Sequence, residues 1–233
     1  MYGMAIEQGW AAASDLVRER NSAGTRQCNA DADFRHVLTM TGQSDNLDDP
    51  EFQYDSSGTA CLDTVADFFA ENNPQGLDPN AWKDRFFLEA LGIEHSDWSG
   101  DFRCGSSVQA SCRDLARAAQ FLLNDGFLPG AGQLADRDYM VESSRAIYPL
   151  SGEEYGYLHW LNPEDPVDPS ITHFGGAASQ CVYVSRETRT VVVSMGQGTQ
   201  SNCRGLTDPR NMLPWAVVRD IVSKKTGGNA TAV

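Results

Sequence analysis

The spacing of apolar residues changes along this chain, and the change limits the folds that the chain can adopt. Apolar side chains up to about residue 142 recur every three or four residues, which is typical of amphipathic helices. Later apolar residues instead form β-rich runs at 155–160, 181–184 and 190–195. Helices first and strands last, without βαβ alternation, predict an α+β domain with an antiparallel sheet flanked by helices.

Several of the expected helices have recognisable ends. Capping residues, Pro at a first helical position and Gly or Asn-Pro at the end mark their limits. Residues 11–33 are polar and are expected to form a surface loop. The predicted helices are residues 1–8 closed by Gly9, 34–40 capped by Asp33, 57–72 closed by Asn73-Pro74, 79–91 capped by Asp78, 112–123 capped by Ser111, 137–142, and a last one starting at Asp208-Pro209.

Length and charge exclude several classes of protein. The 233 residues are enough for one domain, which we place at 1–225, with a frayed tail at 226–233. A net charge of −14, with no cluster of Lys and Arg along the sequence, opposes binding to phosphate backbones, so no nucleic-acid partner is expected. No apolar run approaches the roughly 18 residues that a membrane span needs.

The six cysteines favour disulfides over a metal site. None has C-x-x-C spacing, and the four histidines show no metal-binding spacing, so no metal or other cofactor is expected. Cys104 with Cys112 and Cys181 with Cys203 are near enough in sequence to pair, but six cysteines allow 15 connectivities, and buried free thiols are the alternative. Disulfides favour a secreted or periplasmic location.

Tyr54 is the residue with the clearest chemical potential. It stands in the stretch Phe52-Gln53-Tyr54-Asp55-Ser56, directly before an apolar-periodic run. A tyrosine in such a loop, with Ser56 two positions on, can hold its phenol at the mouth of a cleft while the following helix anchors it. The alternative is a buried aromatic residue that only packs before a helix.

Four segments, taken in order, resemble the serine β-lactamase and penicillin-binding-protein family, including its esterase and 6-aminohexanoate-dimer hydrolase branches. They are residues 34–42, 51–59, 111–126 and 155–160. Together they span most of residues 1–225, and the ordered set is more specific than any one motif. The resemblance implies a β-lactamase/transpeptidase-like fold, acyl transfer through a serine, and a small-molecule acyl substrate: an ester, amide or lactam.

The family has a second motif Y-x-N and a third motif K/H/W-[ST/G]-G on a strand. Tyr54-Asp55-Ser56 resembles the second, with Ser in place of Asn. We assign the third to Phe174-Gly175-Gly176 and expect it at the start of the strand that continues as 182–184. The glycines would admit substrate, and the amide of Ala177 would be an oxyanion donor. Lys225-Thr226-Gly227 matches the letters but follows the last helix.

His173 precedes this triplet and is a further candidate. By strand alternation its side chain points to the face opposite Phe174, unless a bulge redirects it. Its two possible roles are direct catalysis and that of a hydrogen-bonded histidine in the strand.

The first family motif, S-x-x-K, is absent. The only lysines are Lys83, Lys224 and Lys225, and none has a serine three residues earlier. Because residues 2–9 resemble the segment that follows this motif in the family, we expect the domain to be incomplete at its N-terminus and inactive alone. The alternative is a non-catalytic relative that uses the cleft for binding, with Tyr54 and Phe174 stacking on a ligand.

Overall fold

The computed structural model describes residues 1–20, 27–55, 60–98, 108–148, 155–161, 169–176, 180–196, 203 and 212–226. Its helices are α1 (Tyr2–Glu7), α2 (Val17–Arg20), α3 (Phe34–Leu38), α5 (Thr64–Asn72), α6 (Pro79–Lys83), the π-helix η1 (Asp84–Glu89), α7 (Cys112–Leu123), α8 (Arg137–Glu142) and α9 (Met212–Thr226). Its strands are β1 (Asp97–Trp98), β2 (Val108–Gln109), β3 (Phe127–Leu128), β4 (Gly132–Gln133), β5 (Trp160–Leu161), β6 (Ile171–Gly176), β7 (Gln180–Ser185) and β8 (Thr190–Ser194).

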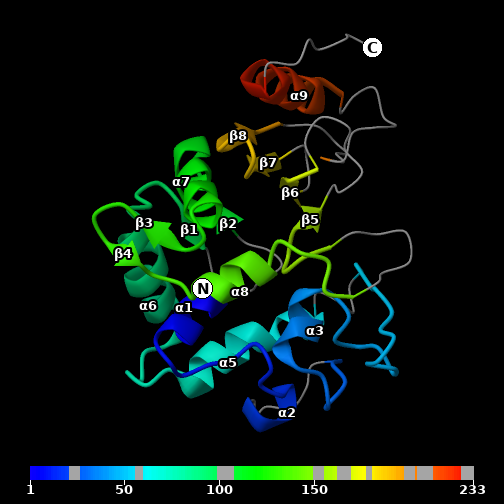
Figure 1. Cartoon of the computed structure of the whole chain (residues 1–233). Helices are drawn as coiled ribbons and strands as arrows, with labels where there is room; N and C mark the ends of the chain where they lie inside the picture. Colours follow the sequence, from blue (N-terminus) through cyan, green and yellow to red (C-terminus); the bar gives the residue numbers. More distant parts are fainter. Residues whose placement is uncertain are drawn as a thin grey trace.

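A four-stranded antiparallel sheet forms the C-terminal half of the fold, in the order β5-β6-β7-β8. It lies beside α7 and beneath α9, while α1, α2, α3, α5, α6 and α8 gather on the other side of the molecule (Figure 1). The predicted hairpin is present, because Val182 of β7 is opposite Val193 of β8. The α+β prediction with an antiparallel sheet is confirmed.

The two faces of the sheet bury different helices. Alternate residues of a strand point to opposite faces. Phe174, Val182 and Val184 pack against Ala119 and Leu123 of α7. The residues between them face the other way, where the buried cluster contains Ile171, Cys181, Tyr183, Cys203, Val218 and Val222 and includes the described part of α9.

The larger core joins the N-terminal helices through aromatic side chains. The Tyr2 ring of α1 lies 4.7 Å from that of Phe34 in α3 and 5.1 Å from that of Phe68 in α5, measured between ring centroids. Phe69 continues the contact to Trp82 of α6 at 4.5 Å. Burial of such large rings contributes favourably to folding, because it removes a large apolar area from water.

The capping predictions hold. Asp33 accepts a hydrogen bond from the backbone N–H of His36, Asp78 accepts from Asn80 and Ala81, and Ser111 accepts from Asp114. The helix expected over 79–91 is not α-helical throughout. After α6, the π-helix η1 takes the place of α-helix from Asp84 to Glu89.

Two local predictions are wrong. The segment 11–33 is not only a surface loop: it contains α2, and Val17 is fully buried with its N–H bonded to the carbonyl of Ala32. The run 155–160 is not one strand, since only its last residue belongs to β5. Its chain turns back instead, because the Gly156 N–H donates to the carbonyl of His159 and Leu158 takes a positive φ of 63°.

Two disulfides tie distant parts of the chain. Cys181–Cys203 was one of the predicted pairs, whereas Cys28–Cys61, at a sequence separation of 33, has no local signal in the sequence. Cys112 is a free, exposed thiol, so the suggested pair of Cys104 with Cys112 is not present. Cys104 itself lies outside the described residues.

Two negative findings apply to the described ranges. None of their helices combines the length and apolar character needed to cross a membrane. Nor does any group of three or more His, Cys, Asp or Glu side chains within those ranges have the arrangement of a metal site.

The Cys181–Cys203 bond should be a large contributor to stability. Replacing both cysteines with serine is expected to lower the free energy of unfolding by about 3 kcal/mol, because the bond restricts the unfolded chain. Urea unfolding monitored by circular dichroism measures this. Cys112→Ser is the matched control and should change the midpoint little; equal losses in both variants would contradict the assignment.

Candidate functional site

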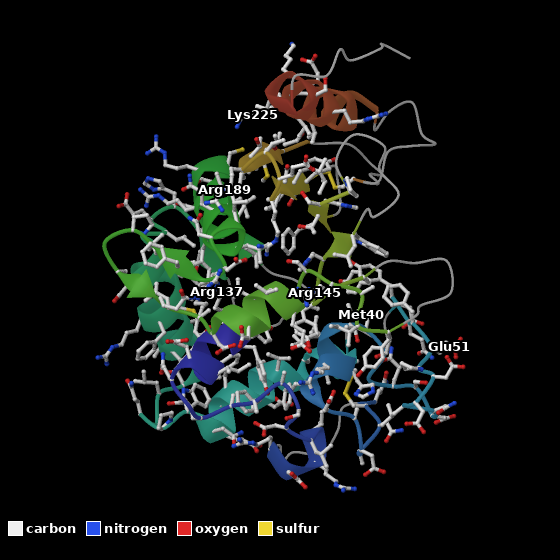
Figure 2. The ribbon with its side chains drawn as sticks, viewed as in Figure 1. Met40, Glu51, Arg137, Arg145, Arg189 and Lys225 are labelled. Carbon is white, nitrogen blue, oxygen red and sulfur yellow. A yellow bond between two sulfur atoms is a disulfide. The ribbon has the colours of Figure 1, made fainter. Side chains whose placement is uncertain are left out.

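The loop that carries Tyr54 is fixed to the end of α3. Met40 adopts a left-handed φ of 60°, which is uncommon for a residue with a side chain, and its carbonyl accepts the N–H of Gln53 at 2.9 Å. The Glu51 N–H donates to Ser44 Oγ at 3.1 Å. Met40 and Glu51 lie on the same side of the molecule, near α3 (Figure 2). Backbone hydrogen bonds therefore hold residues 51–53 and set the position from which Tyr54 projects.

Tyr54 lies on an aromatic surface and is open to solvent. Its side chain is 51% exposed, so it is not a buried core aromatic. Its ring centroid lies 5.2 Å from that of Trp160, 6.1 Å from that of Tyr155 and 6.2 Å from that of Phe52. Burial raises the pKa of Tyr155, and the neighbouring Tyr54 raises it further. No hydrogen bond or ion pair links Tyr54 to another described residue.

Trp160 connects the Tyr54 loop to the sheet. In β5 it is paired with His173 of β6, and the two rings are stacked with centroids 6.4 Å apart. Gly175 lies further along the same strand. The structure thus places Tyr54 against β5, the neighbour of β6, which contains Phe174-Gly175-Gly176. Ser56 and Ala177 fall outside the described residues.

The strand position predicted for Phe174-Gly175-Gly176 is wrong. These residues end β6 and do not begin the strand that contains 182–184, which is β7. Gly175 is paired with Cys181, and an added Cβ on Gly175 would lie 3.3 Å from Cys203 Sγ. Both glycines are exposed. Apolar character alone could not separate two adjacent strands, because the sequence Ala177-Ala178-Ser179 between them contains no strong turn signal.

His173 is packed within the sheet. It is buried and paired with Tyr183, whose ring centroid lies 5.9 Å from its own. Phe174 faces α7 on the other side, so the prediction from strand alternation is confirmed. The rings of Trp160 and Tyr183 both contact the imidazole, as expected for a buried residue within a sheet.

An apolar cavity of about 480 Å³ lies between α1, α7, α8 and the sheet. Sequence analysis did not place it. Phe174 is on its wall, but Tyr54 and Gly175 are not. Its wall consists of Met1, Tyr2, Gly3, Leu38, Val65, Phe69, Phe87, Leu115, Ala118, Ala119, Phe121, Leu122, Ala135, Tyr139, Met140, Ser143, Tyr157, Leu158, His159, Phe174 and Val182.

His159 is a titratable residue in this wall, and no signal in the sequence placed it there. Its Nδ1 lies 3.0 Å from the Tyr157 carbonyl, its ring lies 5.2 Å from that of Phe174, and its Nε2 has no hydrogen-bond partner among the described residues. Burial lowers the pKa of His159 to about 4. Gly156 permits the tight turn, because a Cβ there would lie 2.1 Å from the Ser143 carbonyl oxygen.

The buried His159 predicts a pH dependence of stability. Its pKa is near 6.5 when unfolded and about 4 when folded, so between these values the unfolded chain binds more protons. Above about pH 6.5 the imidazole is neutral in both states, so it does not lower the free energy of unfolding. As the pH falls from 6.5 toward 4, the unfolded chain takes up the proton first, and the free energy of unfolding decreases. Urea titrations from pH 8 to 4 should show a shallower decline for His159→Gln than for the parent. The difference in stability between the two proteins at pH 8 measures the effect of the substitution on packing alone. The same dependence of stability on pH in both proteins would contradict the assignment to His159.

Comparison with known proteins identifies the fold from solved structures. No protein-family model and no curated protein matches the sequence. Solved structures do match, and each of the three described here matches 97% of this chain. An octameric penicillin-binding protein homologue from Pyrococcus abyssi has a TM-score of 0.68 at 13% identity, and this chain covers 63% of it, less than two thirds of its length.

Two further structures agree. A 6-aminohexanoate-dimer hydrolase assigned in Bacillus anthracis has a TM-score of 0.68 at 14% identity, with 71% of its chain covered. Simvastatin synthase from Aspergillus terreus has a TM-score of 0.70 at 13% identity, with 80% covered. At sequence identities this low, the TM-scores show a shared architecture and nothing more specific. The chain therefore has the fold of the serine β-lactamases and penicillin-binding proteins, as its ordered motifs indicated.

Proposed function

We propose that this chain is the C-terminal portion of a β-lactamase-related serine hydrolase, whose S-x-x-K serine and lysine come from residues outside this sequence. The observation that carries the proposal is the apolar cavity between α1, α7 and the sheet. This space of about 480 Å³ is partly open to solvent and lined mainly by apolar side chains, and burying such a surface against another apolar element is favourable. The apolar face of the helix that carries S-x-x-K would fill it.

The supplied serine would attack the acyl carbon of an ester, amide or lactam. A bond forms between the serine oxygen and that carbon, and the bond to the leaving oxygen or nitrogen breaks. The lysine would accept the serine proton, and Tyr54, with Ser56 beside it in the motif, would pass a proton to the leaving group. Water then releases the acyl group.

The strand end would bind the reacting carbonyl. The Ala177 amide would donate to the developing oxyanion, and the absence of side chains at Gly175 and Gly176 would let substrate approach the strand. Phe174 would contribute an apolar contact. The partner is thus a small acyl compound. The net charge of −14 supports a protein without a nucleic-acid partner.

The location that fits this function is secreted or periplasmic. Two disulfides support it, because such bonds persist in oxidising compartments.

The chain as given should be inactive. Loss of a serine nucleophile costs on the order of a millionfold in turnover, whereas one oxyanion amide contributes about a hundred- to a thousandfold. After incubation with a nitrophenyl ester, a penicillin or a linear amide, mass spectrometry of the intact chain should show no added acyl group. A stable acyl adduct on this chain would overturn the assignment of the nucleophile to other residues.

Tyr54 should matter once the nucleophile is present. If the coding frame upstream of Met1 encodes S-x-x-K, the extended polypeptide should hydrolyse one of these substrates. Tyr54→Phe should then lower kcat about a hundred- to ten-thousandfold, as expected for loss of a general acid–base group. Tyr148→Phe is the matched control, since it removes the same hydroxyl from a ring that stacks on His36. Equal effects of the two substitutions would remove Tyr54 from the mechanism.

The cavity itself can be tested with a neutral apolar dye. Nile red should fluoresce with this chain and much less with the extended polypeptide. Ala119→Leu, which adds volume to the cavity wall, should weaken the signal, and Ala116→Leu, on the same helix but outside that wall, should not. If residues 1–233 alone do not bind Nile red, the apolar cavity is not accessible and the proposal loses its support.

The aromatic surface around Tyr54 favours a second candidate, a non-catalytic relative that binds a ligand there. The Tyr54 and Trp160 rings already stand together, with Tyr54 open to solvent. An unrelated upstream sequence or a stop codon would favour this function. Trp160 fluorescence should then change on ligand binding, and Tyr54→Ala should abolish the change.

A further inference from the structure

A second pocket, of about 480 Å³, lies where α7 meets the open edge of the sheet beside β8. It is separated from the candidate site by the width of the sheet, since Trp160 belongs to β5 at the opposite edge. The side chains around it come from four places: α7, the turn between β7 and β8, the start of β8, and the C-terminal end of α9.

Four cationic side chains line this pocket. Arg113 and Arg117 stand one helical turn apart on α7 and share a face. Arg189 comes from the turn and Lys225 from α9; both lie near the end of α7 that faces α9 (Figure 2). No carboxylate is among the described lining residues, although the whole chain carries a net charge of −14.

Neutral groups hold two of these cations in place. Arg189 Nη1 donates to the Leu123 carbonyl at 3.2 Å, and its Nη2 donates to Asn124 Oδ1. Lys225 Nζ donates to Thr190 Oγ1 at 2.8 Å and to the Thr188 carbonyl at 3.4 Å. These contacts position the charges but do not neutralise them.

Arg113 and Arg117 are likewise unneutralised within the described part of the chain, where neither forms an ion pair. Like charges gathered in one pocket repel one another. An anion in the pocket would convert that repulsion into attraction, and it would also join α7, the β7–β8 turn and α9.

We propose that this pocket binds a small molecule that carries a diphosphate group. Three guanidinium groups offer paired N–H donors that match phosphate oxygens, and an ammonium adds a fourth positive charge. The volume is within the roughly 300–1,000 Å³ of small-molecule sites. Gln120 and Thr190 add uncharged polar groups to the wall. The proposal is independent of the hydrolase assignment, because it involves none of the residues of the candidate site.

Calorimetric titration of the full chain with sodium pyrophosphate tests it. We expect one site, with affinity that falls as sodium chloride is raised from about 50 to 200 mM, because exposed charges are screened. Combined Arg113→Gln and Arg117→Gln should weaken binding about a hundredfold, since each charge-assisted hydrogen bond contributes on the order of a factor of ten. Glutamine keeps helix propensity, so folding should be retained.

Arg137→Gln with Arg145→Gln is the matched control. Both arginines are exposed and belong to α8 and the segment after it, away from α9 (Figure 2). This variant should bind pyrophosphate like the parent. Orthophosphate and sulfate should bind more weakly, which distinguishes a diphosphate site from a general oxyanion site. No binding in low salt, equal affinity for sulfate, or an equal loss in the control variant would each overturn the proposal.

Discussion

The packing of Trp160 is the contact on which the candidate site depends. Its backbone pairs with His173 in the sheet, while its ring contacts Tyr54, which comes from the loop after α3. The site residues therefore belong to two parts of the fold that meet at this indole. A half-exposed tyrosine has little to fix its position unless a rigid ring lies beneath it, and Trp160, with Phe52 and Tyr155, supplies that support.

The position of the buried histidine on the cavity wall follows from one close backbone approach. Because Gly156 has no side chain, the chain can turn against the Ser143 carbonyl and direct His159 into the cavity wall. Burial then keeps the imidazole neutral, with one ring nitrogen bonded to the Tyr157 carbonyl. An apolar space with a neutral ring on its wall disfavours a charged ligand, because a charge there would lose its hydration.

Charge is distributed unevenly over this acidic protein. The sequence shows no basic cluster, because Arg113, Arg117, Arg189 and Lys225 are spread over more than a hundred positions. Antiparallel pairing of β7 with β8 and the packing of α7 against them bring these side chains to one sheet edge. The two edges of this sheet therefore differ in chemistry: the aromatic loop lies at one edge and the cationic side chains lie at the other.

The sequence by itself determined the parts that depend on near neighbours. The caps at Asp33 and Ser111, the β7–β8 hairpin and the aromatic loop at Tyr54 could be predicted, because capping, alternation and turns act over a few residues. The turn at Gly156 and the Cys28–Cys61 bond could not, nor could the cavity and the basic pocket. Only the tertiary structure decided these, since they require segments that are distant in sequence to pack together, and no local preference encodes which distant segment a side chain will meet.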